Sequence, residues 1–196
     1  MLQRISENIS HYLVKQNAAT EEKREIIQYG LQSLISTGLA TVIILVVSLL
    51  LGCFGETVVF LSGFVFLRRY TGGYHAGTYL RCFMTTLLAY LLNVGLIQLM
   101  DEAWIFPVLI VTLTISIVLI FLFSPHINPR HPLTERELRL YSRISRFGAV
   151  AIAAAAFVTA LLKANQFALF ICMSLLTTAV TLVVGMLHDR GKKTIQ

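Results

Sequence analysis

Long apolar stretches alternate with short polar segments through most of this chain. A helix needs about 20 mostly apolar residues to cross the hydrocarbon core of a bilayer. We therefore expect spanning helices over residues 34–51, 85–99, 105–123, 147–162 and 167–187. A further stretch, residues 57–67, is shorter and would span if it is tilted or shielded by its neighbours. The pattern predicts an all-α, polytopic membrane helical bundle of about six transmembrane helices. Four or five spans plus a re-entrant segment is the alternative.

The composition agrees with a lipid environment. The 196 residues are 56% hydrophobic and 13% charged, with a mean hydropathy of +0.74. Soluble domains carry about 25% charged residues, so this chain has too little polar material to cover a water-exposed surface. Four prolines and no long linker rich in serine or glycine predict a single integral-membrane domain over residues 1–196. The cysteines, Cys53, Cys82 and Cys172, are odd in number and widely spaced, which predicts free thiols.

Positive charge is distributed unevenly between the two sides of the expected bundle. With six spans, all Lys and Arg residues except Lys163 lie on one side, in the arm 1–30, residues 68–82, residues 124–146 and the tail after residue 187. The positive-inside rule places that side, with both termini, in the cytoplasm. The net charge of +6 then follows from topology and anionic membrane lipid, so we expect no nucleic-acid partner.

Two of the cytoplasmic segments have the spacing of amphipathic helices. In the N-terminal arm, Leu2, Ile5 and Ile9 recur at helical intervals. In the longer basic loop, Thr134-x-x-Glu137 has the form of a capping box, and the arginines after it fall on one side of the expected helix. We expect both helices to lie at the headgroup boundary. A solvated connector is the alternative for the second one.

The stretch RRYTGGYHAGTYLRC, residues 68–82, combines arginines, glycines, a histidine and a cysteine between two apolar stretches. A Cys/His pair is sufficient for acyl transfer, because the imidazole takes the thiol proton and returns it to the leaving group. Neighbouring cationic groups such as Arg81 favour the thiolate. Alternatively, the arginines anchor a helix end and Cys82 is a small interior residue. Spacing alone leaves both interpretations of His75 and Cys82 open.

Direct catalysis by this pair requires the backbone to turn between its members. On an unbroken helix, residues seven apart are separated by about 10 Å of rise, whereas a catalytic hydrogen bond spans about 3 Å. Gly72, Gly73 and Gly77 provide conformational freedom in this region. We therefore predict His75 on a loop or helix start and Cys82 in the first turns of the next span.

A third catalytic group is not found within residues 68–82, which contain no Asp, Glu or Asn. Glu56, Asp189 or Asn128 would approach only through folding, and Glu56 is expected on the opposite membrane face. A Cys-His dyad is therefore the prediction.

Two alternatives would use the same residues differently. A metal site would draw on His75, Cys82, His126 and His131, but no CxxC or HxxxH pairing supports it, so no metal is predicted. A small membrane transporter or peptide exporter without chemistry would use residues 68–82 as a structural loop. Charges along a transport path would support that alternative, and the expected spans are almost free of them.

Taken together, these residues make the chain similar to the accessory gene regulator protein B (AgrB) family. The family motif is an Arg, then a Gly-Gly-x-His-Ala run, then a Cys seven residues after the His. Here these elements are Arg68, GGYHA at residues 72–76 and Cys82. The Phe-Gly-Glu run at residues 54–56 and the Pro-rich loop SPHINPRHP at residues 124–132 also resemble the family. The likeness covers roughly residues 1–190.

The resemblance implies a membrane-embedded cysteine endopeptidase of quorum sensing in Gram-positive bacteria. Such proteins cleave the C-terminal part from an autoinducer propeptide through an acyl-enzyme thioester, and a Cys or Ser of the peptide then closes a thiolactone or lactone ring. Carried over, Cys82 is the nucleophile and His75 the general base and acid. Arg68, Gly72 and Gly73 are supporting motif positions.

The same resemblance sets the expected partners. The substrate is a short amphipathic, AgrD-like propeptide, reached by an active site that faces the cytoplasm from the bacterial cell membrane. Membrane lipid surrounds the bundle and no cofactor is expected. Independently of the resemblance, a compact helical bundle is compatible with a homodimer. Whether the product is cyclised depends on the nucleophile of the peptide itself.

Overall fold

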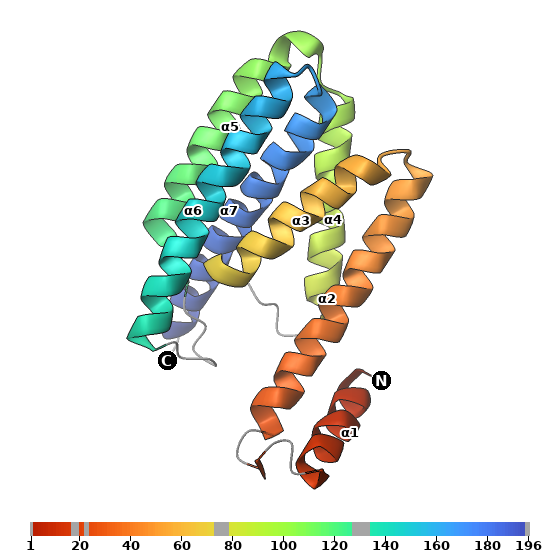
Figure 1. Ribbon diagram of the computed structural model, residues 1–196, viewed down its shortest axis with the longest axis vertical. Coiled ribbons are helices and arrows are strands. Elements are labelled where there is room, and N and C mark those ends of the chain that lie inside the picture. Colours follow the sequence, from red (N-terminus) through yellow and green to blue (C-terminus); the bar gives the residue numbers. More distant parts are fainter. Residues whose placement is uncertain (1, 17–19, 22–23, 73–78, 127–133, 195–196) are drawn as a thin grey trace. The chain divides into compact units, whose positions relative to one another are not determined.

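The computed structural model describes residues 2–16, 20–21, 24–72, 79–126 and 134–194, and this part of the chain is almost entirely helical (Figure 1). The helices are α1 (Leu2–Lys15), α2 (Arg24–Leu50), α3 (Phe54–Thr71), α4 (Tyr79–Gln98), α5 (Glu102–Phe123), α6 (Glu135–Leu161) and α7 (Asn165–Thr194). No strand occurs among the described residues. The predicted all-α fold is confirmed.

Four of the described helices are long and apolar enough to cross a membrane. They are Gly30–Leu50 within α2, Glu102–Phe123, Glu135–Leu161 and Asn165–His188. Phe83–Gln98 within α4 is a shorter apolar helix, and α3 has 18 residues with two arginines in its last turn. The membrane bundle is thus confirmed, whereas the count of six spans and the orientation of the termini stay predictions.

The chain divides into two units. The first comprises residues 1–47 and 76–88, and the second comprises residues 48–75 and 89–196. In the first unit, α1 confirms the helix predicted for the N-terminal arm. The hydroxyl of Ser10 donates to the carbonyl of Glu7, and Ile9 and Tyr12 are exposed. Its place at the headgroup boundary stays a prediction.

The second unit is built around α7, which contacts α3, α5 and α6. Every residue from Ala168 to Leu175 is buried. On α6 the buried positions after Ser145 are alanines at helical spacing, namely Ala149, Ala153, Ala156 and Ala160. Small side chains allow helices to approach closely in a membrane, where packing rather than hydrophobicity drives association. The core of this unit is therefore held by close helix packing.

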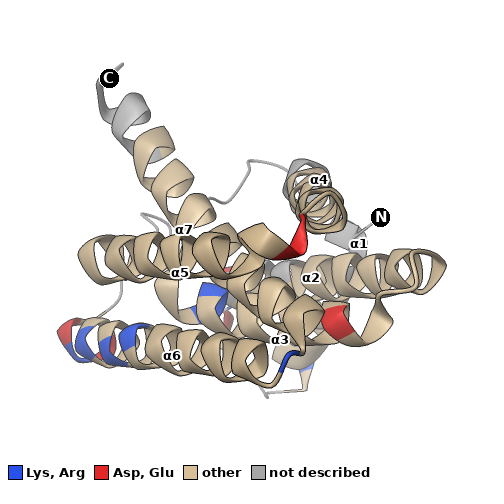
Figure 2. Cartoon of the chain, turned by 90° about the horizontal axis from the view of Figure 1, so that it is seen from above, with Lys and Arg blue, Asp and Glu red and all other residues tan. Residues whose placement is uncertain are grey.

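One helix differs from the sequence prediction. The basic segment that opens at Thr134 was expected to be a separate surface helix, and this is wrong, because it continues without a break into the following span as α6. At about 1.5 Å per residue, 27 residues span about 40 Å, more than the roughly 30 Å of hydrocarbon. The charged turns are thus the end of a spanning helix that extends beyond the apolar layer. Figure 2 shows these charges gathered at one end of α6.

The capping box predicted at the start of α6 is confirmed. The backbone N–H of Glu137 donates to Oγ1 of Thr134 over 3.4 Å, and the backbone N–H of Thr134 donates to Oε2 of Glu137 over 2.9 Å. These bonds satisfy two backbone donors that a helix N-terminus leaves without intrahelical partners. The capping-box motif therefore predicted the start of α6 correctly, and only the predicted extent of the helix was wrong.

Candidate active site

In the sequence, the residues of the predicted active site occupy the end of α3, the start of α4 and the stretch of chain that links these two helices. Arg68 is in the last turn of α3, and Gly72 follows it as the C-terminal cap. Cys82 is the fourth residue of α4, so its expected position in the first turns of that helix is confirmed. Gly73 and His75 lie outside the described residues, as does the side chain of Cys82. The pairing of His75 with Cys82 stays a prediction.

The first glycine of the motif is required by the backbone. Gly72 has φ 73° and ψ −152°, a combination that is accessible essentially only to glycine. Its N–H donates to the carbonyl of Arg68 over 3.2 Å. A Cβ atom at this position would collide with the backbone carbonyl oxygen of His126. Gly72 therefore both ends α3 and admits a neighbouring segment, which explains one of the two motif glycines physically.

Arg68 is half-buried and lies over its own helix. Its guanidinium carbon is 5.6 Å from the centroid of the Phe64 ring, within the range of a cation–π interaction. Phe64 itself is buried, whereas the neighbouring Arg69 is exposed. The two arginines of the motif thus differ in environment, and the one matched by the family motif is the more enclosed.

The Pro-rich loop contacts the end of α3 directly. The backbone N–H of His126 donates to the carbonyl oxygen of Thr71 over 2.9 Å, and Thr71 is fully buried. In the sequence, this loop stands out only by its resemblance to the family, and nothing in it predicts a contact with α3. Its nearness to the motif follows only from the way in which α3, α5 and α6 pack around α7 in the second unit.

None of the candidate third groups is placed beside the motif by the described residues. Glu56 is in the first turn of α3, so about 22 Å of helix rise separates it from Thr71, and this does not favour it as a partner of His75. Asn128 lies outside the described residues, and so does the side chain of Asp189. The dyad stays the prediction.

The other two cysteines, Cys53 and Cys172, are free, as predicted, and both are buried. Sγ of Cys53 is 3.5 Å from the hydroxyl of Tyr90, which in turn lies 2.7 Å from Oγ1 of Thr57. Sγ of Cys172 donates to the carbonyl of Leu109 over 3.9 Å. The sulfur atoms of both cysteines thus have hydrogen-bonding partners inside the protein, which is typical of structural rather than reactive thiols.

Metal binding receives no support from the described residues, among which no group of three or more His, Cys, Asp or Glu side chains gathers. Of the four residues of the metal alternative, only His126 has a described side chain.

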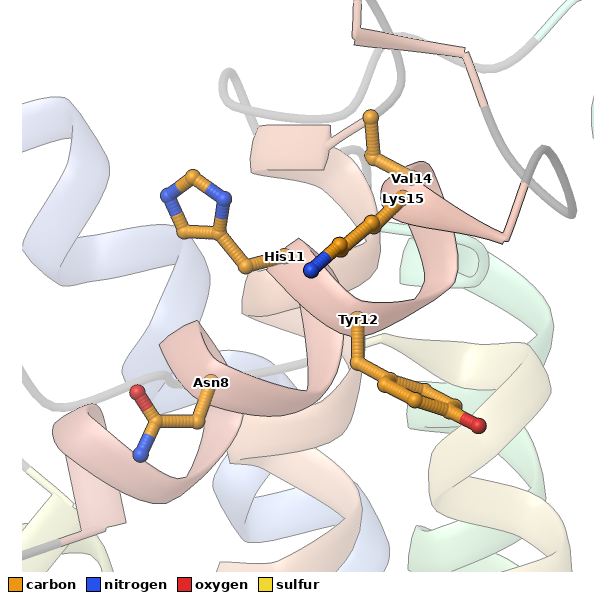
Figure 3. A pocket seen from close by; sticks show the side chains of 5 residues that line it. All are labelled: Asn8, His11, Tyr12, Val14 and Lys15. Carbon is orange, nitrogen blue, oxygen red and sulfur yellow. The ribbon is translucent and has the colours of Figure 1, made fainter.

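In the first unit, an open depression of about 530 Å³ lies along α1 and is lined by Asn8, His11, Tyr12, Val14 and Lys15 (Figure 3).

Comparison with known proteins gives a match to the family model described as Accessory gene regulator B, over residues 6–182. The chain belongs to the AgrB family. This match includes α3, α4 and the whole of residues 68–82, as well as the Pro-rich loop. The AgrB family is implicated in the processing of autoinducer peptides in quorum sensing, so the chain has a role in peptide processing at a membrane.

Individual AgrB relatives are of moderate similarity. The chain is 30% identical over 129 residues to an AgrB-like protein 1 of Clostridium perfringens strain 13, which covers 65% of this chain and 67% of the relative. It is 30% identical over 150 residues to an AgrB-like protein of Clostridium beijerinckii, covering 74% and 73%. No solved structure matches the chain.

Proposed function

We propose that this AgrB-family protein is a membrane-embedded cysteine endopeptidase that cleaves an autoinducer propeptide. The observation that carries the proposal is the family match over residues 6–182, within which Arg68, the GGYHA run at residues 72–76 and Cys82 keep the family motif. Membership alone supports peptide processing. The presence of a nucleophile and a base seven residues apart supports cysteine chemistry as its means.

In this mechanism His75 accepts the thiol proton of Cys82, and the thiolate attacks the carbonyl carbon of the scissile peptide bond. The tetrahedral adduct collapses, the C–N bond breaks, and the imidazolium of His75 gives its proton to the departing amine. The products of this step are the C-terminal fragment with a free amine and a thioester between the remaining peptide and Cys82. No cofactor takes part.

The thioester conserves the activation needed for ring closure. A thiol or hydroxyl of the bound peptide attacks the thioester carbonyl and loses its proton to His75, and the released sulfur of Cys82 takes up a proton. A thiolactone forms if the attacking group is a Cys thiol, and a lactone forms if it is a Ser hydroxyl. Attack by water instead would give the linear acid.

The arrangement of the second unit supports a shared cytoplasmic face for the motif and the basic loop. The end of α3 contacts residue His126 after α5, and Ser124 bonds Ser145 in α6. The arginines of α3 and of the first turns of α6 therefore lie at one end of this helix group. A bias of Lys and Arg towards one end of spanning helices is typical of the cytoplasmic side, where a newly made propeptide is available.

We further propose that the propeptide reaches the site along the membrane surface, as an amphipathic peptide bound at the lipid headgroups. We also propose that the protein forms a homodimer in the membrane. Co-purification from detergent and cross-linking in native membranes test both the binding of the propeptide and the dimer.

The deciding experiment mixes candidate propeptide with membranes that contain wild-type protein, Cys82→Ala, Cys82→Ser or His75→Ala. We expect each substitution to lower the cleavage rate by roughly 10³-fold or more, because removal of a nucleophile or its base abolishes the covalent route. A peptide adduct on wild-type protein that is released by hydroxylamine would identify the thioester.

Cys172→Ala is the matched control. It removes a thiol from the second unit, where Cys172 is buried among the packed helices, and leaves the motif intact. We expect cleavage to be retained. Undiminished cleavage by Cys82→Ala would contradict the proposal and favour a non-catalytic role such as peptide export.

A further inference from the structure

We propose that the segment of residues 124–126, which follows α5 and begins the Pro-rich loop, is a positioning element of the active site. It holds the last residue of α3 and the first motif glycine, and so sets the direction in which the chain leaves α3 towards His75. This inference rests on the proposed peptidase function and adds positioning residues to it.

The first contact is a backbone hydrogen bond at the end of α3. The last carbonyl groups of a helix have no intrahelical partner and must find another donor when they are buried. Thr71 is fully buried, and its carbonyl oxygen accepts from the N–H of His126 over 2.9 Å. The 124–126 segment therefore supplies the donor that the end of α3 requires.

The second contact is the close approach of the His126 carbonyl to Gly72. The space that a Cβ atom would need at Gly72 is occupied by this carbonyl oxygen, and Gly72 adopts a conformation accessible essentially only to glycine. Two successive residues at the end of α3 thus meet the two backbone groups of one residue, His126. The motif glycine and the segment fit each other.

The segment is itself fixed to the neighbouring helices. The N–H of Ser124 donates to the carbonyl of Ile120 over 3.0 Å and ends α5. The hydroxyl of Ser124 donates to Oγ of Ser145 in α6 over 2.8 Å, and both serines are buried. The hydroxyl of Ser145 in turn donates to the carbonyl of Ser142 over 3.1 Å.

Helix α6 also contacts the end of α3 directly. The rings of Tyr70 and Tyr141 pack edge to face, with centroids 5.4 Å apart. A Cβ atom on Gly148 would lie 2.8 Å from the Phe66 ring, so the two helices approach closely there. The 124–126 segment is therefore one side of a rigid junction formed by α3, α5 and α6.

This junction matters for catalysis because His75 is only four residues beyond Thr71. A misplacement of about 1 Å at a reacting group lowers rates by about 10²-fold even when the group itself is intact. His126 acts here through its backbone and through Gly72, so it is a positioning residue and not a catalytic one.

The test compares His126→Pro, which removes the N–H donor, with His126→Ala, which keeps it. In full-length protein in membranes, with propeptide as substrate, we expect His126→Pro to lower kcat about 10- to 100-fold with KM changed less than about twofold. His126→Ala is expected to keep kcat within about twofold of wild type.

A second pair of variants covers the case in which proline disturbs folding. Gly72→Ala places a Cβ against the His126 carbonyl, whereas Gly95→Ala adds a methyl group where nothing lies within 4 Å. We expect Gly72→Ala to show the same loss of kcat and Gly95→Ala to show none. Elution as a single folded species in detergent is the common folding control.

A readout independent of the propeptide is the pH profile of Cys82 alkylation by iodoacetamide, followed by mass spectrometry of the peptide that contains Cys82. A displaced imidazole no longer favours the thiolate, so His126→Pro and His75→Ala should both move the profile to higher pH, and His126→Ala should not.

The outcomes separate the two proposals. Absence of Cys82-dependent cleavage in wild-type protein refutes the proposed function, and this inference with it. Cys82-dependent cleavage with equal kcat and equal alkylation profiles for His126→Pro and His126→Ala, and full activity of Gly72→Ala, refutes the positioning role alone.

Discussion

Nδ2 of Asn93 in α4 donates a hydrogen bond to Oγ1 of Thr177 in α7 over 2.8 Å. The contact joins the C-terminal part of α4, within the second unit, to its central helix. Polar side chains that bond across helices in a membrane contribute about 0.6 kcal/mol on average and up to about 1.7 kcal/mol. Asn93 thus anchors the helix whose first turn carries Cys82.

We predict a measurable coupling between these two residues. Asn93→Ala should lower the free energy of unfolding in detergent by about 1 kcal/mol, because the amide donor is lost. A double-mutant cycle with Thr177→Val should give a coupling energy of about 0.5–1.5 kcal/mol. Additive effects of the two substitutions would contradict a direct bond between them.

Substitution of Gly63 by alanine should weaken the packing of α3 against α7. A Cβ atom on Gly63 would lie 2.7 Å from Oγ of Ser174, and overpacking of this kind costs about 1–3 kcal/mol. Gly63→Ala should therefore lower the thermal midpoint, and Ser174→Ala should restore part of the loss by removing the hydroxyl. Gly95→Ala, in open space, should not lower it. A midpoint unchanged by Gly63→Ala would rule out this close approach.

Thiol labelling should distinguish the structural cysteines from the predicted nucleophile. Cys53 is 8% exposed and Cys172 is 0% exposed, so we expect both to resist N-ethylmaleimide in folded protein and to react in dodecyl sulfate. The measurement is mass spectrometry of labelled peptides. Rapid labelling of Cys172 before unfolding would show that α7 is not packed as described.

The capping box of α6 should contribute to stability by itself. Replacement of an N-cap threonine by alanine costs about 0.5–2 kcal/mol, so Thr134→Ala should lower the free energy of unfolding by about that amount. Thr114→Ala is the matched control, since Thr114 is exposed and its hydroxyl donates to the carbonyl of Ile110 in its own helix, away from the helix start. An equal effect of both substitutions would mean that the cap has no special role.

The topology can be checked with a membrane-impermeant maleimide in a Cys82→Ala background. Lys163 follows α6 at the end away from the basic turns, so Lys163→Cys should be labelled in intact cells. Arg136, exposed in the first turns of α6, should become accessible as Arg136→Cys only after permeabilisation. The reverse pattern would invert the proposed cytoplasmic orientation.

The helix boundaries illustrate where sequence reasoning worked and where it failed. Apolar content located the centre of each expected span, but α2 begins at Arg24 and α6 at Glu135, each about ten residues before the apolar stretch. Hydropathy reports where a helix meets lipid, whereas backbone hydrogen bonding continues until a cap or a breaker ends it. The capping box at Thr134 marks the true start of α6, but the sequence pattern predicted that it begins a separate surface helix.

The buried polar contacts were beyond reach of the sequence. Cys53 and Thr57 lie at the start of α3 and Tyr90 lies in α4, and the sequence gives no sign that Tyr90 bonds the other two. The same holds for Thr71 and His126. Such contacts join residues that are 33 to 55 positions apart, and their formation depends on how α3 meets α4 and the segment that follows α5.

The sequence by itself determined the helical membrane class, the free thiols at Cys53 and Cys172, the family and the motif residues, because hydropathy, residue spacing and motif identity are properties of the chain. Tertiary structure decided that α6 is one helix and that the end of α3 rests against the segment of residues 124–126. Tertiary structure also explains the glycine at position 72. The backbone there adopts a conformation that other residues avoid, and the carbonyl oxygen of His126 occupies the space that a Cβ atom would need. Both conditions arise only when the neighbouring backbone is in place.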